Sequence, residues 1–318
     1  FGMYLEVCGN GADDGVDIEF QDDGRVILHS SQQCNGQGHQ TTVTQILSDR
    51  LGYDADLIKV EQGDSNRSPR GTTGGARMTA VLGSATAVAA AKIIDLAKPF
   101  AAEALECCEN DLKFTDGLFL RQDTNRSIGI EDLVRQLAAS GEKHRLNWAQ
   151  PYETDGATYP YGCHIIELEI DRQTCAVDIA SYQVTDDFGI VINPLTLEGQ
   201  IHGGIAQGVG QALLEHVVYD DSGQLLAGSL MDYALPRADH FPGFQISTRN
   251  TACANNALGI KGSGEAGAIG APQAVISAIC DALDITHIDM PATPLAIFNA
   301  MKAKTANSLM HKGERGER

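Results

Sequence analysis

Three glycine-rich segments in this sequence each come directly before a stretch with helical periodicity. They are Gly36-Gln37-Gly38, Gly71-Thr72-Thr73-Gly74-Gly75 and Gly262-Ser263-Gly264. Glycine lets backbone N–H groups approach an anion closely, and the helix N-terminus adds favourable partial charge. The same glycines can also serve only as turns and helix caps. Because three such loops occur, and because Arg77 and Lys261 supply a cation beside two of them, the set favours phosphate binding over simple turns.

Glu265 lies in the third loop, immediately before a predicted helix. A carboxylate held among small residues with little polar surface has a raised pKa and can act as a general base. A carboxylate at a helix N-terminus can instead do no more than complement the helix dipole. Position in the sequence favours the dipole role, and both roles stay open at this point.

The third loop also fits the dinucleotide-binding fingerprint G-x-G-x-x-G over residues 262–267. That fingerprint needs a hydrophobic strand directly before it and an acidic residue after the following strand. Residues 251–256 are loop-like instead, and no parallel βαβ pattern occurs elsewhere. A nicotinamide-binding oxidoreductase is therefore only a minor alternative.

Other reactive side chains give weaker signals. His39 has no Asp, Glu, His or Cys at ligand spacing, so we expect no protein-ligated metal there. Ser84 and Ser263 lack the strand–G-x-S-x-G–helix context of a hydrolase nucleophile. The eight cysteines are scattered without a C-x-x-C pair, which argues against zinc and iron–sulfur sites. We expect reduced thiols that pack as small apolar side chains.

Composition limits the class of protein. The 318 residues include 23 Lys and Arg against 42 Asp and Glu, a net charge of −19. This excess of acid argues against a nucleic-acid groove or binding to an anionic membrane. We expect a globular, cytoplasmic protein, because the pattern contains neither a membrane span nor a signal peptide. Since the first residue is Phe1, we also expect a processed chain or part of a longer one.

Hydrophobic periodicity predicts an α+β fold made of two similar units. The first unit covers 1–125, with a β-hairpin over 16–28, a helix over 43–51 that ends at Gly52, and a strand over 57–60. An alanine-rich helix over 83–98 is expected to break or kink at Pro99 and to resume through Cys108, and 114–120 to form one closing strand.

Residues 126–158 are predicted to connect the units, with one helix over 130–139. The second unit, 159–303, is expected to hold a hairpin over 166–179 and a helix over 199–215. A further helix carries Pro272 near its first turn, the last helix starts at Thr293-Pro294, and 304–318 is a polar tail. Hairpin, loop and helix thus occur twice, which predicts a duplicated β-β-α-β-α-β unit.

Several motifs occur together in a fixed order along the chain. These motifs are GQGHQTT (36–42), GGAR (74–77), DFG (187–189), NP (193–194), GQIHGGIAQG (199–208), YALPR (233–237) and KGSGE (261–265). With them, nearly all of residues 1–300 resemble the C-terminal half of the molybdopterin-binding subunit of molybdenum hydroxylases. This family includes xanthine dehydrogenases, aldehyde oxidoreductases and aerobic carbon monoxide dehydrogenases.

The resemblance implies roles for the matching positions. Glu265 matches the family's glutamate base beside molybdenum, which favours the base role over the dipole role. Gln200 matches a glutamine that contacts the pterin near the metal, and Ala76 stands where a serine is common. The implied cofactor-binding residues are Gln37, Gly38, His39, Gly74, Gly75, Ala76, Arg77, Thr79, Ser84, Gln200, Lys261, Gly262, Ser263 and Gly264.

The resemblance also implies a cofactor, a reaction and partners. The cofactor is molybdopterin cytosine dinucleotide with Mo, held through its dithiolene and not by protein ligands. The reaction hydroxylates an aldehyde, an N-heterocycle or a similar small molecule with oxygen from water, or oxidises CO. Electrons leave to a [2Fe-2S] subunit and an FAD subunit, since this chain has neither Fe-S nor FAD. The N-terminal half of the molybdopterin subunit would complete the pocket, in a higher oligomer. A non-catalytic molybdopterin-binding or chaperone-like protein is the alternative.

Overall fold

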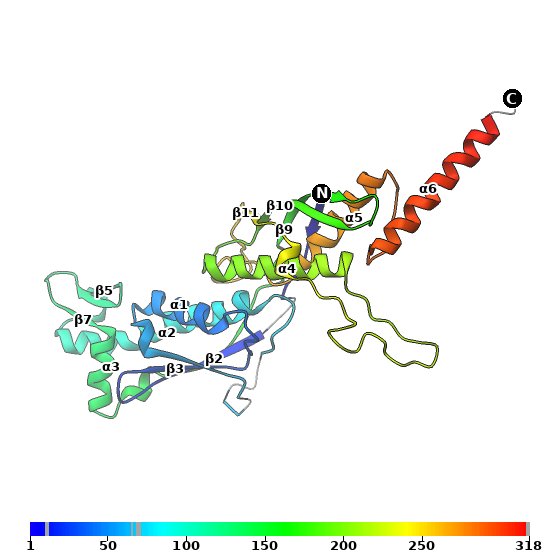
Figure 1. Ribbon diagram of the computed structural model, residues 1–318. Helices are drawn as coiled ribbons and strands as arrows, with labels where there is room; N and C mark the ends of the chain where they lie inside the picture. Colours follow the sequence, from blue (N-terminus) through cyan, green and yellow to red (C-terminus); the bar gives the residue numbers. More distant parts are fainter. Residues whose placement is uncertain (10–12, 65, 68–70, 316–318) are drawn as a thin grey trace.

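The computed structural model describes residues 1–9, 13–64, 66–67 and 71–315, with side chains up to 305 (Figure 1). Two lobes lie side by side, one drawn in blue to green and the other mostly in green to orange with the dark-blue N-terminal strand, and the last helix projects from the second lobe. Each lobe has its own hydrophobic core. The α+β fold with two units agrees with the sequence pattern.

The first unit is built on a four-stranded sheet. Its order is β4 (Ile58–Gln62), β3 (Val26–Ser30), β2 (Asp13–Phe20) and β8 (Trp148–Glu153). The β2–β3 pair is the predicted antiparallel hairpin, whereas β3 and β4 run parallel. Alternate residues of β2 are buried, so the period of two in the sequence buries one face of the sheet.

Two helices pack against this sheet. Helix α1 (His39–Leu51) buries the predicted apolar face and ends at Gly52, whose φ of 61° needs a residue without a side chain. Helix α2 (Ser84–Leu105) follows a single π-helical turn over Thr79–Gly83. The predicted break at Pro99 is wrong, because α2 continues through it. Pro99 is exposed while Ala97 and Ala101 on either side are fully buried, so the core anchors the helix on both sides of the proline.

A small third sheet follows the end of α2. The single strand expected over 114–120 is wrong: β5 (Leu112–Thr115) and β6 (Leu118–Arg121) form a hairpin, joined by Asp116 and Gly117 with φ of 47° and 79°. Strand β7 (Ser127–Gly129) pairs with β6. An Asp-Gly pair is the usual sequence for such a turn.

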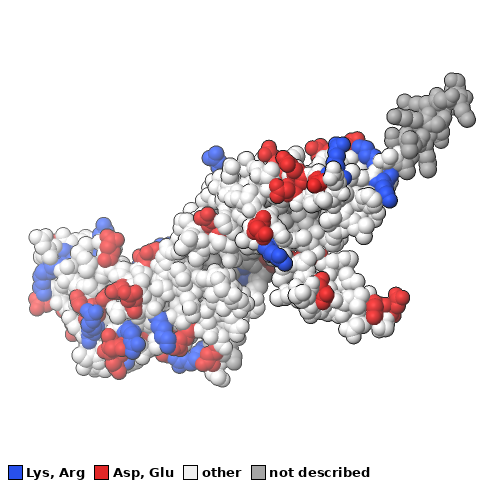
Figure 2. Space-filling view, in the orientation of Figure 1, with Lys and Arg blue, Asp and Glu red and all other residues white. Residues whose placement is uncertain are grey.

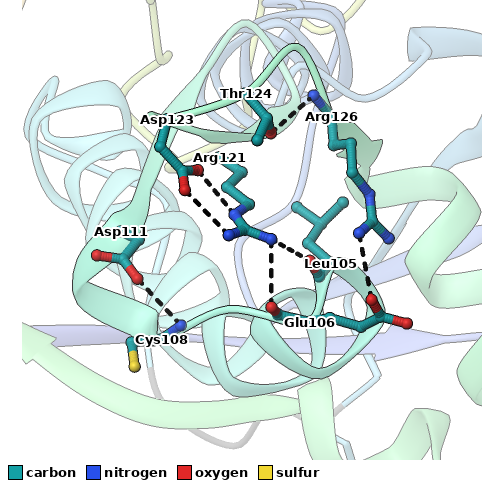
Figure 3. A network of polar contacts seen from close by, with 8 residues as sticks. All are labelled: Leu105, Glu106, Cys108, Asp111, Arg121, Asp123, Thr124 and Arg126. Atoms are coloured by element: carbon teal, nitrogen blue, oxygen red, sulfur yellow. Dashed lines mark hydrogen bonds and ion pairs between the residues drawn. The ribbon is translucent and has the colours of Figure 1, made fainter.

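Arg121 fastens this sheet to the C-terminus of α2 (Figure 3). Its guanidinium donates to the carbonyl oxygens of Leu105 and Glu106, both at 3.3 Å, and pairs with Asp123 at 2.7 Å. Arg126 reaches the Glu106 carboxylate at 3.4 Å. The last carbonyls of a helix have no partner within it, so an arginine at this end satisfies them.

The predicted connection over 126–158 joins the units and also supplies a strand to the first sheet. Its helix α3 spans Ile130–Ala139, as the pattern indicated. Strand β8, however, pairs antiparallel with β2 and completes the first sheet. The pairing joins residues 130 to 140 positions apart, for example Ile18 with Trp148, so local periodicity could not predict it.

The second unit repeats the topology of the first. Its sheet order is β1 (Gly2–Leu5), β9 (Tyr161–Ile170), β10 (Val177–Asp187) and β11 (Phe244–Thr248). The β9–β10 hairpin is the predicted one, and β10 and β11 run parallel as β3 and β4 do. The outer strand comes from the start of the chain, since β1 pairs with β9.

Helices α4 (Pro194–Leu213) and α5 (Ala266–Leu283) pack on this sheet and on each other. Helix α4 starts five residues before the expected Gly199, because the Asn193 side chain accepts from the Thr196 amide at 3.0 Å and caps it. Pro272 lies well inside α5 and not near its first turn. Helix α6 spans Pro294–Arg315, so most of the expected polar tail is helical; 316–318 lie outside the described residues.

Glycines bring α4 and α5 into close contact. A Cβ on Gly204 would lie 3.0 Å from Gly267 Cα, and one on Gly208 would lie 2.9 Å from Ala271 Cβ. The Gly-rich sequence of α4 therefore permits backbone-to-backbone packing. By length and composition, α2 with its π turn and α5 could each cross a membrane. Both instead supply buried residues to the two cores of this fold.

Candidate functional site

A pocket of about 240 Å³ lies where the two units meet. All three glycine-rich segments contribute to its wall, together with the loop between β10 and α4 and the first turns of α4. The residues that line it are Gln37, His39, Thr42, Thr73, Gly74, Gly75, Ala76, Arg77, Met78, Thr79, Phe188, Ile190, Val191, Ile192, Asn193, Thr196, Leu197, Gln200, Ile260, Lys261, Gly262, Ser263, Gly264 and Glu265.

The first loop aims its backbone amides at one point. The N–H groups of residues 36–39 converge on the sulfur of Cys34. Burial alone would raise the pKa of the Cys34 thiol, but these donors lower it. Such a nest of amides ahead of α1 is the arrangement that stabilises anions. Next to it, His39 is buried, which lowers its pKa to about 4 and keeps the imidazole neutral.

The second loop turns sharply beside the pocket. Gly75 and Ala76 both adopt left-handed conformations, with φ of 59° and 48°. Alanine is strained there, so a tightly held turn is required. The Gly9 amide donates to the Gly75 carbonyl oxygen at 3.2 Å, and the Arg77 Nε donates to the Thr72 carbonyl oxygen at 3.0 Å. The loop is thereby fixed with Gly74 and Gly75 exposed to the pocket.

The third loop packs against the second. A Cβ on Gly262 would overlap the carbonyl oxygen of Ala76 and lie 2.7 Å from Cys8 Sγ. Lys261, expected to face a phosphate, instead donates to Asp187 Oδ2 at 2.9 Å with its side chain only 9% exposed. Burial raises the pKa of Asp187, but Lys261 and the amides of Gly189 and Thr251 outweigh it and lower the pKa to about 2. The charge of Lys261 is therefore already compensated.

Glu265 sits at the pocket wall immediately before α5. Its backbone carbonyl accepts from the Ile269 amide at 3.0 Å, but its side chain makes no capping hydrogen bond to the helix. The dipole role thus has no hydrogen bond to support it. Ser263, Gly264 and Ala266 provide the expected small neighbours, although the Glu265 side chain is exposed in this chain. Gln200 of α4 lies across the third loop, 3.6 Å from where a Cβ of Gly264 would be.

Two of the expected cofactor residues do not line the pocket. Gly38 caps α1 with φ of 79° and lies against Thr196 of α4. Ser84 is completely buried at the start of α2, with its hydroxyl 3.5 Å from Asn256 Oδ1. Ser84 therefore supports the fold behind the site and does not face it.

Sequence reasoning missed part of the wall. The segment 188–193 and the first turn of α4, with Thr196 and Leu197, supply its apolar side. The DFG and NP motifs mark this segment, but neither motif shows that it lies beside loops that are more than 100 residues away. Within the described ranges, no cluster of three or more His, Cys, Asp and Glu could hold a metal ion, and all eight cysteines are free.

A family model described as the molybdopterin cofactor-binding domain matches residues 1–242. The chain belongs to this family. The pocket suits a molybdopterin, since amide-rich loops face it. A cofactor of this family would be held by backbone amides and neutral side chains such as His39.

Named relatives of this molybdopterin-binding chain are oxidoreductases. The carbon monoxide dehydrogenase large chain of Hydrogenophaga pseudoflava is 34% identical over 305 residues, which is 93% of this chain and 38% of the relative. The nicotine 6-hydroxylase large subunit of Paenarthrobacter nicotinovorans is 33% identical, over 91% of this chain and 37% of its own. The chain thus spans well under half the length of these relatives.

Solved structures with the same fold cover almost the whole chain. The CO dehydrogenase from Oligotropha carboxidovorans superposes with a TM-score of 0.88 at 29% identity, covering 96% of this chain and 41% of that one. Quinoline 2-oxidoreductase from Pseudomonas putida 86 gives 0.85 at 29% identity, covering 95% and 41%. The family and the fold expected from the motifs are confirmed.

Proposed function

We propose that this chain forms the C-terminal half of the molybdenum-cofactor subunit of a molybdenum hydroxylase. The observation that carries the proposal is the position of Glu265, on the wall of a pocket that the three amide-rich loops surround. The reaction would hydroxylate an aldehyde, an N-heterocycle or a similar small substrate with oxygen from water, or oxidise CO. Relatives named for CO, nicotine and quinoline chemistry support this range of substrates.

The residues of this chain would divide the work between binding and proton transfer. The bound cofactor supplies the molybdenum at which oxygen is transferred and two electrons are accepted. The loops at 36–39 and 73–77 would hold its pterin and phosphates, and Gln200 would lie against the pterin. The Glu265 carboxylate would accept the proton that water loses as its oxygen is transferred to the substrate.

The assembly must extend beyond this chain. We propose that the N-terminal half of the subunit closes the pocket over Glu265, and that a [2Fe-2S] subunit and an FAD subunit carry the electrons away. In the described ranges no cysteine cluster could hold an iron–sulfur centre. We further propose a cytoplasmic location and a heteromeric complex.

Glu265→Gln tests the proposal. The variant keeps the shape of the side chain and removes the base, so we expect turnover by the assembled enzyme to fall by about 10²–10⁴-fold with unchanged molybdenum content. Steady-state kinetics and metal analysis measure the two quantities. The matched control is Glu198→Gln, which alters an exposed carboxylate of α4 outside the pocket wall and should leave both quantities unchanged. Full activity of Glu265→Gln at full molybdenum content would contradict the assignment.

The nucleotide form of the cofactor is a separate prediction. Two amide-rich loops, at 36–38 and 71–77, are more than a single pterin phosphate requires, so we propose the cytosine dinucleotide. Acid hydrolysis of the purified complex should release CMP in a one-to-one ratio with molybdenum, measured by chromatography. Pterin without any nucleotide would overturn this part of the proposal and leave the role of Glu265 intact.

A further inference from the structure

A short segment after β1 forms part of the structure behind the pocket. The Glu6 and Cys8 amides donate to the carbonyl oxygens of Pro160 and Thr158, at 3.0 and 2.8 Å, ahead of β9. The next residue, Gly9, donates to Gly75 in the second loop. The side chain of Cys8 touches the third loop at Gly262. Residues 6–9 therefore lie directly beneath two of the loops that surround the pocket.

Glu6 points into the protein from this segment. Only 7% of the residue is exposed, whereas its neighbours Leu5 and Val7 are 68% and 56% exposed. The Glu6 carboxyl lies within hydrogen-bonding reach of the Cys8 thiol and of the Glu265 carboxyl. Its Oε2 is buried and receives no hydrogen bond from any donor in the described ranges. Two facing carboxyl groups can bond to each other only if one of them carries a proton.

The surroundings determine which carboxyl is protonated. The titratable groups around Glu6 are Tyr4 and Cys8 on its own segment and Glu265 ahead of α5. The nearest lysine in the third loop, Lys261, is occupied by Asp187. Burial raises the pKa of Glu6 to about 7, the hydrogen bond and charge of Glu265 add to the rise, and the Cys8 thiol opposes it. Below about pH 7, Glu6 is therefore the carboxyl group of the pair that carries the proton.

We propose that Glu6 is a positioning residue for Glu265. As a carboxylic acid it donates a hydrogen bond to one oxygen of Glu265 and so directs the other oxygen toward the pocket. The inference rests on the proposed role of Glu265 as the base. When Glu6 ionises, the donor is lost and the two carboxylates repel each other, which drives Glu265 out of position.

The pH profile distinguishes this role from a purely structural one. In the assembled enzyme, kcat/KM should decrease as the pH rises above about 7, where Glu6 loses its proton. Glu6→Gln keeps an N–H donor that does not titrate, so we expect activity within a few-fold of wild type and a profile without this alkaline decrease. Glu6→Leu has similar size but no donor, and its kcat should fall by roughly 10–100-fold. A Glu6→Gln profile that matches wild type overturns the proposal.

Infrared difference spectroscopy gives a readout that does not depend on turnover. Because burial also raises the pKa of Asp186 to about 7, the spectra are recorded in an Asp186→Asn background. There the complex should show the C=O stretching band of a protonated carboxylic acid that disappears as the pH rises through about 7. Glu6→Gln should remove the band, Glu265→Gln should shift it, and the control Glu167→Gln, at an exposed position of β9, should leave it unchanged. A band that survives in Glu6→Gln refutes the pair. If the band behaves as expected while Glu265→Gln remains active, the carboxyl pair stands and the proposed function fails.

Discussion

At the scale of single residues, the site depends on glycines, which have no side chain, as much as on residues whose side chains line the pocket. Gly262 lies against the backbone of Ala76 and the thiol of Cys8, so the second and third loops can touch only because it has no Cβ. Gly264, two residues later, has nothing nearer than 3.6 Å to the position of a Cβ. Alanine substitutions at the two glycines can therefore be compared: one adds a methyl group in a crowded place, and the other adds it where there is room.

We expect Gly262→Ala to destabilise the contact between the loops and Gly264→Ala to leave the free energy of unfolding nearly unchanged. The added methyl at 262 forces the loops apart, which should lower the free energy of unfolding by about 1–3 kcal/mol and reduce the molybdenum bound per complex. Urea unfolding and metal analysis of both variants measure these effects. Equal behaviour of the two variants would show that contact between the loops does not matter.

Residue types and spacing singled out the three loops and Glu265, which the structure brings to one pocket, but they did not single out Glu6. The loops carry glycines beside helix starts, which have a recognisable chemistry in the sequence. Glu6 is one acid among many, and its importance comes from burial next to Glu265, 259 positions away. For Lys261 the sequence predicted a charge that is free to face a phosphate, whereas the structure pairs this lysine with Asp187. Contacts between residues so far apart in the sequence form only in the folded chain, so local sequence patterns do not predict them.

At the scale of elements, the helices and hairpins that form from neighbouring residues were predictable, and the distant pairings were not. The β2–β3 and β9–β10 hairpins, α1 and α3 follow from local alternation, caps and glycine stops. Strands β1 and β8 are edge strands whose partners are far away in the sequence. At Pro99 a sound local rule failed, because burial on both sides keeps α2 continuous.

The continuity of α2 makes a prediction about stability. Proline in a helix interior removes one backbone hydrogen bond and crowds the carbonyl four residues earlier, which here belongs to Asp95. Pro99→Ala should restore that bond and raise the free energy of unfolding by about 1–3 kcal/mol, since the site is exposed and needs no repacking. Urea titration measures the change, with Lys98→Ala as the control on the same turn. A less stable Pro99→Ala would mean that the ring itself stabilises α2.

At the scale of the whole molecule, the surface contains a projecting group of exposed apolar side chains. The segment 214–243 between α4 and β11 projects from the second unit (Figure 1). Its large exposed apolar residues are Val217, Val218, Tyr219, Leu225, Leu226, Leu230, Met231 and Leu235. On the face drawn in Figure 2, positive and negative side chains are interspersed over the first unit, and no broad basic surface appears. An apolar projection of this size is typical of a surface that binds protein.

We expect the isolated chain to fold, to self-associate, and to bind little or no molybdenum. Each unit has its own core, so folding needs no partner, but the pocket is open beside Glu265 and a charged cofactor gains less from amides in contact with water. Size-exclusion chromatography and metal analysis measure both properties. Co-expression with an N-terminal half should restore molybdenum and abolish self-association. Stoichiometric molybdenum and turnover in the chain alone would contradict the expected division of the pocket.

Strand β1 also sets the order in which a ribosome can finish this protein. Leu5 pairs with Tyr161, so β1 leaves the exit tunnel 156 residues before its partner does. At about 5–20 residues per second, this leaves roughly 8–30 s in which β1 lacks its partner β9. During that time β2, β3, β4 and β8 are all synthesised, and the first sheet can close without it. Glu6 travels with β1, and Glu265 is made later still. A ribosome that stalls after β8 has emerged and before β9 emerges therefore displays a closed first sheet together with a β1 strand that still lacks β9, and a chaperone would have to shield such a nascent chain.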